Sequence, residues 1–456
     1  MTALYDSKTK TINDYGVRKY FSNKEKYKTW LFFEKSLATA QAKYGIIPDE
    51  IAIDINNNLK IENIDFEKMN RIYEEIGHGF VPFLKVLVDA CNEESGKYIH
   101  YGITTQNIQQ SSEMYIMKKI HYKFMEISKD ILNNLSNLAE KYSQTIMPGR
   151  THGRHATPVT YGYKVSAWIS ELISNIENLI DSEKRVFKIM MGGAVGTFST
   201  MPKNGKEVQN EVGNLVNMEV MEVPSRNINT HKIEYINNLT LIANVFHKIA
   251  EEVYSTSVEE IAEVTEIIKK GTIGSSTMPH KINPKLSKGI IANSQKLYSL
   301  PEVALHSSAR IYEGDSSSYM LIDGVVNEAM ELMTEIILRA EELTRTIQIN
   351  TEKMNKNANI NKGLDNSENI MMIIADRLGK DKSHSLIYEL TMQSIDENKN
   401  FLDVLKENED INDHFTLEEL TEFLKPENYI GQAPILAELM SKKASDFANK
   451  LQRNYC

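Results

Sequence analysis

Cysteine and long apolar runs are nearly absent from this chain of 456 residues. Its two cysteines, Cys91 and Cys456, exclude a disulfide framework and a cysteine-rich metal site. No run approaches about 18 apolar residues and residues 1–16 hold no apolar signal segment, so we expect a cytoplasmic protein that does not span a membrane. Basic residues number 52 against 62 acidic ones, and the net charge of −10 argues against nucleic acid or anionic membrane as a partner.

Glycine and proline are also scarce, at 22 and 11 residues. Residues 103–147 and 225–270 contain neither, and each stretch could form a helix up to roughly 65 Å long. In the second stretch apolar residues recur at steps of three and four, the helical period. They are Ile233, Ile236, Leu239, Ile242, Phe246, Ile249 and Val253. We expect this stripe to be too long for one subunit to cover, and to be buried between subunits.

The remaining pattern is helical too. Residues 163–191 and 325–362 lack both breakers and carry apolar positions at helical spacing, whereas alternating strand patterns are hard to find. We predict an all-α protein with an N-terminal helical domain at 1–106, a central bundle of long helices at 107–352 and a C-terminal helical domain at 353–456. A long coiled coil is the weaker alternative, because strict heptads are not sustained.

The glycines cluster in four segments, each at an end of an expected long helix. These segments are 98–106 (YIHYGITTQ), 147–158 (MPGRTHGRHATP), 192–197 (GGAVGT) and 271–284 (GTIGSSTMPHKINP). Helix ends expose backbone N–H groups that suit anions. The serines and threonines in these segments can equally be helix caps and turn residues.

The segment 271–284 does not match several common catalytic signatures. A phosphate-binding loop needs a glycine directly before its lysine, but the residue before Lys281 is a histidine. HExxH is absent, so we expect no metal, and no GxSxG follows a strand, which argues against a serine hydrolase. Two hydroxyls, a cation and an amide, from Ser275, Ser276, Lys281 and Asn283, fit proton abstraction beside a carboxylate.

The string GSSTMPHKINP at 274–284 resembles the signature loop of the fumarase and aspartase superfamily, which reads GSSxMPxKxN. Three more blocks resemble the superfamily in the same order: IHYGITTQN at 99–107, GRTHG at 149–153 and GAVGT at 193–197. KPENYIGQAP at 425–434 is similar to the tail of its adenylosuccinate lyase and carboxymuconate cycloisomerase branch. The resemblance implies a lyase without a cofactor that releases fumarate by β-elimination from a substituted succinate, in a homotetramer whose sites are shared between subunits.

The resemblance also implies roles for individual residues. Ser276 matches the catalytic base and His152 the general acid, while His78 and His100 match two further site histidines. A serine can act as a base where backbone N–H groups and a cation such as Lys281 stabilise its alkoxide. The remaining candidates are suited to binding the dicarboxylate and its charged intermediate. They are Thr104, Thr105, Gln106, Thr151, Ser275, Lys281 and Asn283.

The chain departs from the adenylosuccinate lyase pattern where that enzyme binds its nucleotide. Gly77 and Gly79 flank His78, Gly314 replaces an arginine, and Asp323 stands at the second arginine of the same block. An aspartate would repel a phosphate. We therefore expect a small succinylated amino acid or thiol, such as S-(2-succino)cysteine, as substrate. Adenylosuccinate is the alternative, carboxymuconate a distant one, and a crystallin-like structural role the non-enzymatic one.

Two departures lie closer to the chemistry. Lys288 stands where the family has a glutamate that pairs with the acid histidine, so the sequence does not show what orients His152. A thiolate leaving group would need less protonation than an amine, which fits this loss. A glutamine that the family uses against the substrate aligns with Ile228, and Arg226 is close enough in sequence to substitute for it.

Overall fold

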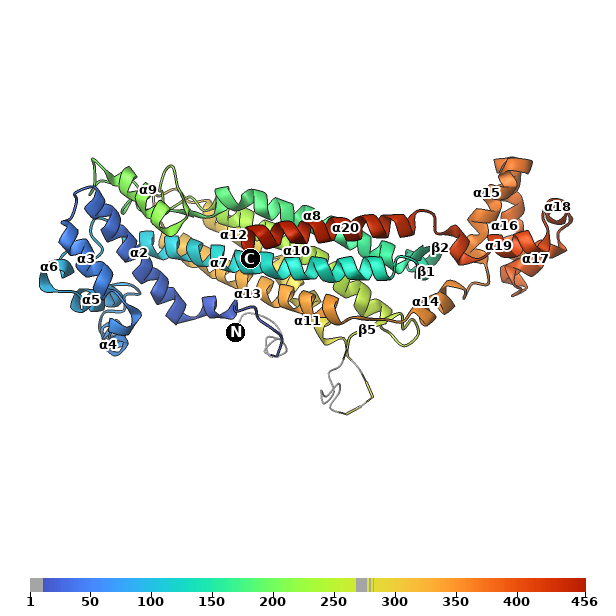
Figure 1. Cartoon of the computed structure of the whole chain (residues 1–456), viewed down its shortest axis with the longest axis horizontal. Coiled ribbons are helices and arrows are strands. Elements are labelled where there is room, and N and C mark those ends of the chain that lie inside the picture. The colour runs from blue at the N-terminus through green and yellow to red at the C-terminus, as the bar shows by residue number, and fades with distance from the viewer. Residues whose placement is uncertain (1–10, 268–276, 279, 282) are drawn as a thin grey trace.

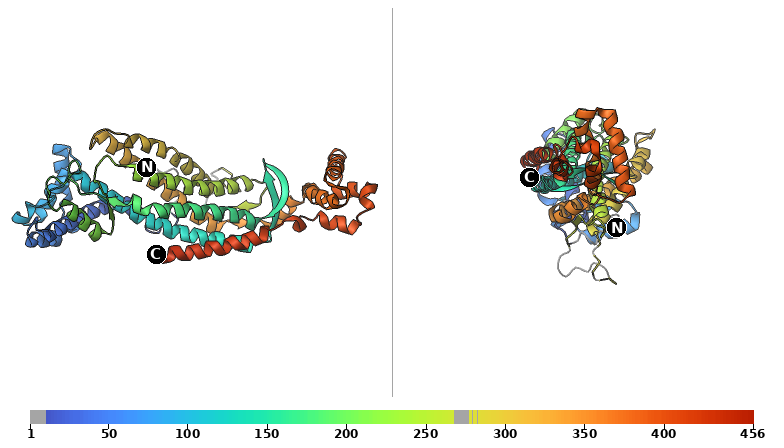
Figure 2. Two further views of the ribbon diagram at one scale, coloured as in Figure 1. Left: turned by 90° about the horizontal axis from the view of Figure 1, so that it is seen from above. Right: turned by 90° about the vertical axis from the view of Figure 1, so that its right-hand side faces the viewer.

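The protein is described here by a computed structural model that covers residues 11–267, 277–278, 280–281 and 283–456. The described part is elongated, with long helices running side by side along its length and smaller groups of helices at the two ends (Figure 1; Figure 2). This confirms the all-α prediction. None of the described helices is both long and apolar enough to cross a membrane.

Short helices form one end of the molecule (Figure 1). Around the start of α2 they pack on an aromatic cluster in which Trp30 lies 4.7 Å from Phe80 and 5.2 Å from Phe83 between ring centroids. The elements are the 3₁₀ turns η1 (Arg18–Phe21) and η2 (Ile61–Asn63) and the helices α2 (Asn23–Lys43), α3 (Asp49–Asn58), α4 (Phe66–Ile76), α5 (Val81–Ala90) and α6 (Glu93–Gly96).

The middle of the molecule is a helical bundle. Its longest helix, α7, has 37 residues and therefore spans about 55 Å. The bundle and its connections comprise α7 (Thr105–Lys141), α8 (Tyr161–Val186), α9 (Gly205–Val216), α10 (Thr230–Thr256), α11 (Lys285–Leu297), α12 (Leu300–Ser308) and α13 (Ser316–Thr346). Two-residue strands link parts of it: β3 (Lys188–Ile189) pairs with β4 (Glu219–Val220), and β5 (Val264–Thr265) with β6 (Gln348–Ile349).

The apolar stripe of α10 corrects one expectation. All seven residues from Ile233 to Val253 are at most 4% exposed within the single chain. They are covered by the neighbouring helices of the same bundle, because α8, α11 and α13 all pack against α10. The stripe therefore gives no reason to expect a second subunit, and the tetramer needs a different argument.

The GRTHG segment forms an antiparallel hairpin, β1 (Ile146–Thr151) and β2 (Arg154–Thr160), which the helical reading of the sequence missed. Its two-residue turn has positive φ at both positions, 51° at His152 and 74° at Gly153. That is the geometry of the tight turn that matches the twist of a hairpin. A proline and a register irregularity between Pro148 and Arg150 interrupt the alternation of residues that would have predicted a strand.

The second end of the molecule has a hydrophobic core of its own, built from residues between Ile370 and Leu424. Its elements are α14 (Thr351–Ala358), η3 (Leu364–Asn366), α15 (Ser367–Leu378), α16 (Lys380–Asp396), α17 (Phe401–Glu407), α18 (Glu409–Asn412), α19 (Leu417–Phe423) and η4 (Pro426–Tyr429). The final helix α20 (Ala433–Tyr455) instead runs back along the bundle against α7 and α8 (Figure 1).

Hydrogen bonds fix α20 to the bundle. Ser136 Oγ donates to the backbone oxygen of Ser441 at 2.9 Å, and Lys129 Nζ donates to Gln452 Oε1 at 3.0 Å. The proposed division at 106/107 and 352/353 stays a prediction. Within the predicted C-terminal domain, however, α20 packs with the central helices, because its apolar face, including Phe447 and Leu451, belongs to the main core.

Candidate active site

The segment before α7 and the first turn of that helix carry four of the candidate residues. His100 has φ of +60° and Gly102 of +76°, so the chain turns sharply before it enters the helix. Thr104 is the N-cap of α7, and its backbone N–H donates to Asn107 Oδ1 at 3.2 Å. Thr105 and Gln106 form the first turn. This turn offers backbone N–H groups and the positive end of the longest helix, which suits an anion.

A buried carboxylate holds His100. Glu34 of α2, whose side chain is 1% exposed, lies 2.7 Å from His100 Nδ1 between Oε1 and the ring nitrogen. A carboxylate accepts hydrogen bonds, so this contact places the proton of the imidazole on Nδ1. The other ring nitrogen, Nε2, is buried and has no hydrogen-bond partner among the described residues. It is therefore available to a substrate group.

The glycine-rich segment 192–197 meets the same end of α7. Gly193 N donates to Asn107 Oδ1 at 3.0 Å, so one side chain binds both the start of the helix and this loop. Gly193 and Gly196 have φ of +81° and +82°. Thr200 Oγ1 also donates to the backbone oxygen of Gly102 at 2.5 Å. Two of the sequence blocks, far apart along the chain, are thus joined at one place.

His78 lies at the start of α5. Its Nδ1 accepts hydrogen bonds from the backbone N–H groups of Phe80 and Val81, both at 3.1 Å, and the residue is exposed. This interaction caps the helix and fixes the ring. It leaves the other imidazole nitrogen open to a ligand.

Thr151 and His152 are placed by the hairpin, and both are exposed. The hairpin is tied down by Arg150, whose guanidinium makes two hydrogen bonds, of 2.9 and 2.5 Å, with the fully buried carboxylate of Glu263. Asn357 Nδ2 donates to the same carboxylate at 2.8 Å. The hairpin follows the C-terminal end of α7 (Figure 1). His100 precedes the N-terminal end of this 37-residue helix, so the length of α7, about 55 Å, separates it from Thr151 and His152.

The described residues of the signature segment lie just before α11. Ser275 and Ser276 lie outside the described residues, and Lys281 and Asn283 lie just before α11. Glu266 fixes the base of the segment, because its buried carboxylate accepts from the backbone N–H groups of Leu286 and Ser287 at 2.9 and 2.8 Å. The candidate residues therefore occupy separate places in one chain. Within one chain, His100 and the residues from Thr104 to Gln106 lie together at the start of α7. His152 lies apart from them in the hairpin turn.

Two known protein families match this chain. Residues 6–296 match the family described as Lyase, and residues 363–439 match the adenylosuccinate lyase C-terminus. The adenylosuccinate lyase of Methanocaldococcus jannaschii is 31% identical over 93% of each chain. The chain belongs to the fumarase and aspartase superfamily of lyases.

Other relatives of this lyase carry a second activity in their names. The N-acetyl-S-(2-succino)cysteine lyase of Dickeya dadantii is 28% identical over 92% of this chain and 93% of its own. Among solved structures, a fumarate lyase from Mesorhizobium sp. BNC1 superposes with a TM-score of 0.88 at 24% identity, covering 94% of this chain and 98% of that chain. The relatives support a lyase that releases fumarate, and they leave its substrate open between at least two kinds of conjugate.

Arg226 takes up the space at one position where the lyase departs from the adenylosuccinate lyase pattern. A side chain at Gly314 would collide with the guanidinium of Arg226 and the hydroxyl of Tyr319. Arg226 lies over the Tyr319 ring, with its guanidinium carbon 5.4 Å from the ring centroid. The guanidinium of Arg226 therefore places a positive charge beside Gly314, the position at which adenylosuccinate lyases have an arginine. From the sequence, we expected Arg226 to substitute for the family glutamine that aligns with Ile228. In the structure it lies instead beside Gly314, where the family has an arginine.

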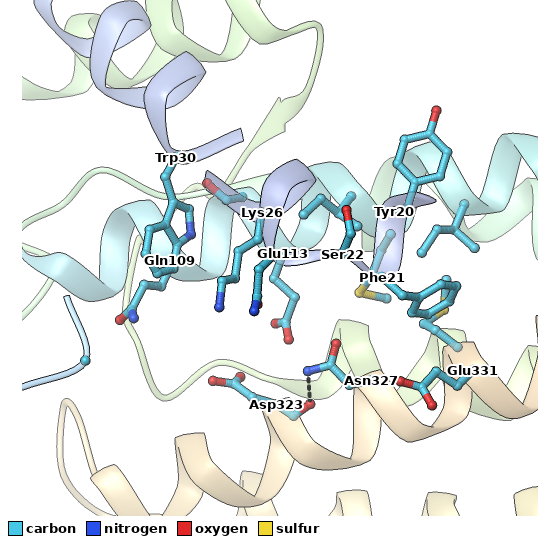
Figure 3. Close-up of a pocket in the computed structure, with 17 residues that line it drawn as sticks. Tyr20, Phe21, Ser22, Lys26, Trp30, Gln109, Glu113, Asp323, Asn327 and Glu331 are labelled. Atoms are coloured by element: carbon cyan, nitrogen blue, oxygen red, sulfur yellow. Dashed lines mark hydrogen bonds between the residues drawn. The ribbon is translucent and has the colours of Figure 1, made fainter. Parts of the chain in front are cut away.

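A cavity of about 560 Å³ lies next to the start of α7 (Figure 3). It is bounded by η1 and the start of α2, by the first half of α7 and by the start of α13. Gly79, next to His78, lines it, and so does Gln109, one helical turn after Thr105. The cavity thus neighbours the candidate residues along the chain, although His78, His100 and Thr104 to Gln106 do not themselves line it.

Two carboxylates on one wall of the cavity share a lysine behind it. Lys232 is 1% exposed, and its Nζ lies 2.6 Å from Glu113 Oε2 and 3.5 Å from Asp323 Oδ1. Burial, only partly offset by Lys232, raises the pKa of Glu113. Burial opposes the charged form of Lys232, but the two carboxylates outweigh it and raise the pKa of Lys232. No sequence motif marked Glu113 or Lys232.

Proposed function

We propose that this lyase cleaves a small succinylated amino acid or thiol, such as S-(2-succino)cysteine, to fumarate and the free amine or thiol. The observation that carries the proposal is the pair of carboxylates, Glu113 and Asp323, at the cavity beside the candidate site. Lys232 is already shared by both of them, so it is not free to pair with a phosphate, and the two carboxylates would repel one. Relatives named as N-acetyl-S-(2-succino)cysteine lyases, one of them from Enterococcus italicus at 30% identity, support this substrate class.

The chemistry requires one base and one acid. In the proposed mechanism Ser276, as alkoxide, takes the proton from the carbon beside a carboxylate of the succinyl group. The electrons left on that carbon form the double bond of fumarate as the carbon–sulfur or carbon–nitrogen bond breaks. His152 protonates the leaving group, so the acid and base are both accounted for. Lys281, Asn283 and the hydroxyls of Thr104 and Thr105 stabilise the extra charge on the carboxylate.

A homotetramer with shared sites is part of the proposal. His100 and His152 lie at opposite ends of the 37-residue helix α7, so a site that contains both needs more than one chain. Apolar side chains around the turn between α12 and α13 support an assembly. Leu305, Ile311, Tyr312 and Met320 are 56% to 85% exposed there, which is a large apolar area for a free surface.

Mixing two inactive variants tests the shared site. His100→Ala and His152→Gln should each lose activity, but after the two proteins are unfolded together and refolded, some mixed tetramers would contain a site without either substitution. We expect activity to return in the mixture and not in either protein refolded alone. A mixture as inactive as its components, with mixed tetramers shown by native mass spectrometry, would contradict the shared site.

Substrate identity is tested by fumarate release from S-(2-succino)cysteine, its N-acetyl derivative, adenylosuccinate and a succinylated amino acid with a carbon–nitrogen bond. We expect kcat/KM for a small conjugate to exceed that for adenylosuccinate by at least about tenfold, or roughly 1.4 kcal/mol in transition-state binding. Ser276→Ala should lower kcat by several orders of magnitude with substrate binding largely retained.

Adenylosuccinate remains the second candidate substrate. It is favoured by the match of residues 363–439 to the adenylosuccinate lyase C-terminus and by the relative from M. jannaschii. Efficient cleavage of adenylosuccinate with the small conjugates inert would replace the first proposal by this one. Near wild-type turnover in Ser276→Ala would remove the assigned base.

A further inference from the structure

The cavity beside the candidate site has opposite charges on its two sides. Lys26, from the start of α2, extends into it from one side and Asp323 of α13 lies on the other, with Glu113 of α7 drawn between them (Figure 3). Burial lowers the pKa of Lys26. Its Nζ lies 5.2 and 5.3 Å from the ring centroids of Tyr27 and Trp30, and it makes no ion pair with a carboxylate among the described residues. An anionic partner for this ammonium is thus missing from that part of the chain.

A second, independent feature also points to a ligand. Ser112 lines the cavity and is 1% exposed, yet its hydroxyl has no hydrogen-bond partner among the described residues. A buried hydroxyl without a partner is costly, and native proteins rarely leave one in that state. A polar group of a bound molecule would satisfy it. The volume of about 560 Å³ lies within the range of small-molecule pockets, roughly 300 to 1,000 Å³.

We propose that this cavity binds the leaving group of the substrate as a free α-amino acid, its carboxylate on Lys26 and its ammonium on Asp323 and Glu113. The inference rests on the proposed function and makes it more specific, because it requires an α-amino group that is not acylated. An amino-acid zwitterion satisfies both sides of the cavity at once. An N-acetyl group would remove the ammonium and leave the two carboxylates facing an uncharged amide.

The decisive comparison is between S-(2-succino)cysteine and N-acetyl-S-(2-succino)cysteine, assayed by fumarate absorbance with the intact protein. A charge-assisted hydrogen bond that only the free amine can make predicts a kcat/KM about 10 to 100 times higher for the free amine. Asp323→Asn should lower kcat/KM for the free amine and leave that for the acetylated substrate nearly unchanged. Lys26→Met should lower both, since both substrates keep the α-carboxylate.

Glu331→Gln is the matched control. Glu331 lines the same cavity about two helical turns further along α13 than Asp323, so its substitution removes a carboxylate of the cavity and should leave the ratio of the two substrates unchanged. Inhibition by the products gives a readout independent of turnover. Free cysteine should inhibit wild-type enzyme at least about tenfold more strongly than N-acetylcysteine, and Asp323→Asn should abolish the difference.

The outcomes separate the two proposals. Fumarate release from both cysteine conjugates at similar rates, or faster from the acetylated one, would overturn the inference and retain the proposed function. An equal loss on both substrates in Asp323→Asn would also overturn it, since the residue would then act on folding or on the succinyl group. No fumarate from any small conjugate would refute the proposed function itself.

Discussion

Replacing Glu34 by glutamine tests how the site histidine is held. Glu34 Oε1 lies 2.7 Å from His100 Nδ1, and the two side chains are 1% and 11% exposed. Hydrogen bonds to charged groups contribute about 1.5–3 kcal/mol, and the amide keeps part of that because its oxygen can still accept. A loss of about 2 kcal/mol of transition-state binding predicts a roughly 30-fold lower kcat/KM. The amide can also donate, which would place the proton of His100 on the wrong nitrogen.

A double-mutant cycle gives the sharper test. If Glu34 acts only through His100, then Glu34→Gln should lower kcat/KM in the wild-type background and have little further effect in His100→Ala. Circular dichroism and thermal unfolding would show whether the fold is retained. Equal effects of Glu34→Gln in both backgrounds, or none in either, would refute the positioning role.

Three further predictions follow from contacts elsewhere in the chain. Arg150→Met should destabilise the fold by roughly 3–5 kcal/mol in thermal or urea unfolding, because it leaves the fully buried carboxylate of Glu263 without its cation, and Arg150→Lys should cost less; an unchanged midpoint would contradict this. Burial raises the pKa of Glu113 from its usual 4.5 to about 7, so its contribution to stability is complete below about pH 4.5 and is lost as the pH rises through 7. Relative to Glu113→Gln, wild type should therefore lose on the order of 2 kcal/mol between pH 5 and 8, and a constant difference would count against the raised pKa. His152→Gln should reduce kcat severely for an amine leaving group and mildly for a thiol, and equal losses would indicate that His152 only positions the substrate.

The sequence was sufficient for the helices, whereas the roles of the residues at the start of α7 stay a prediction. Long stretches without glycine or proline became α7 and α10, and the block 99–107 folds as one turn and helix start. Burial was harder to predict. The stripe from Ile233 to Val253 shows that a helix is covered on one side, but it does not show whether the cover comes from the same chain.

The sequence indicates the charged residues around the candidate site less clearly than it indicates the helices. Glu34 lies four residues after Trp30 on the buried face of α2, and a carboxylate at an apolar position indicates a buried partner without naming it. Glu113, Lys232 and Asp323 come from three helices, so their meeting depends on tertiary packing that no local pattern contains. His152 could be named from its block, but the tight hairpin turn that exposes it was not expected.

The return of α20 to the bundle has a consequence for synthesis on the ribosome. Helix α7 emerges early, but the contact of Ser136 with Ser441 and that of Lys129 with Gln452 become available only after 305 and 323 further residues have been translated. At about 5–20 residues per second this delay is roughly 15 to 60 seconds. During that time the faces of α7 and α8 that α20 will cover are exposed in the nascent chain and could bind a chaperone. A stalled or truncated product would keep that apolar surface and be prone to aggregation or proteolysis.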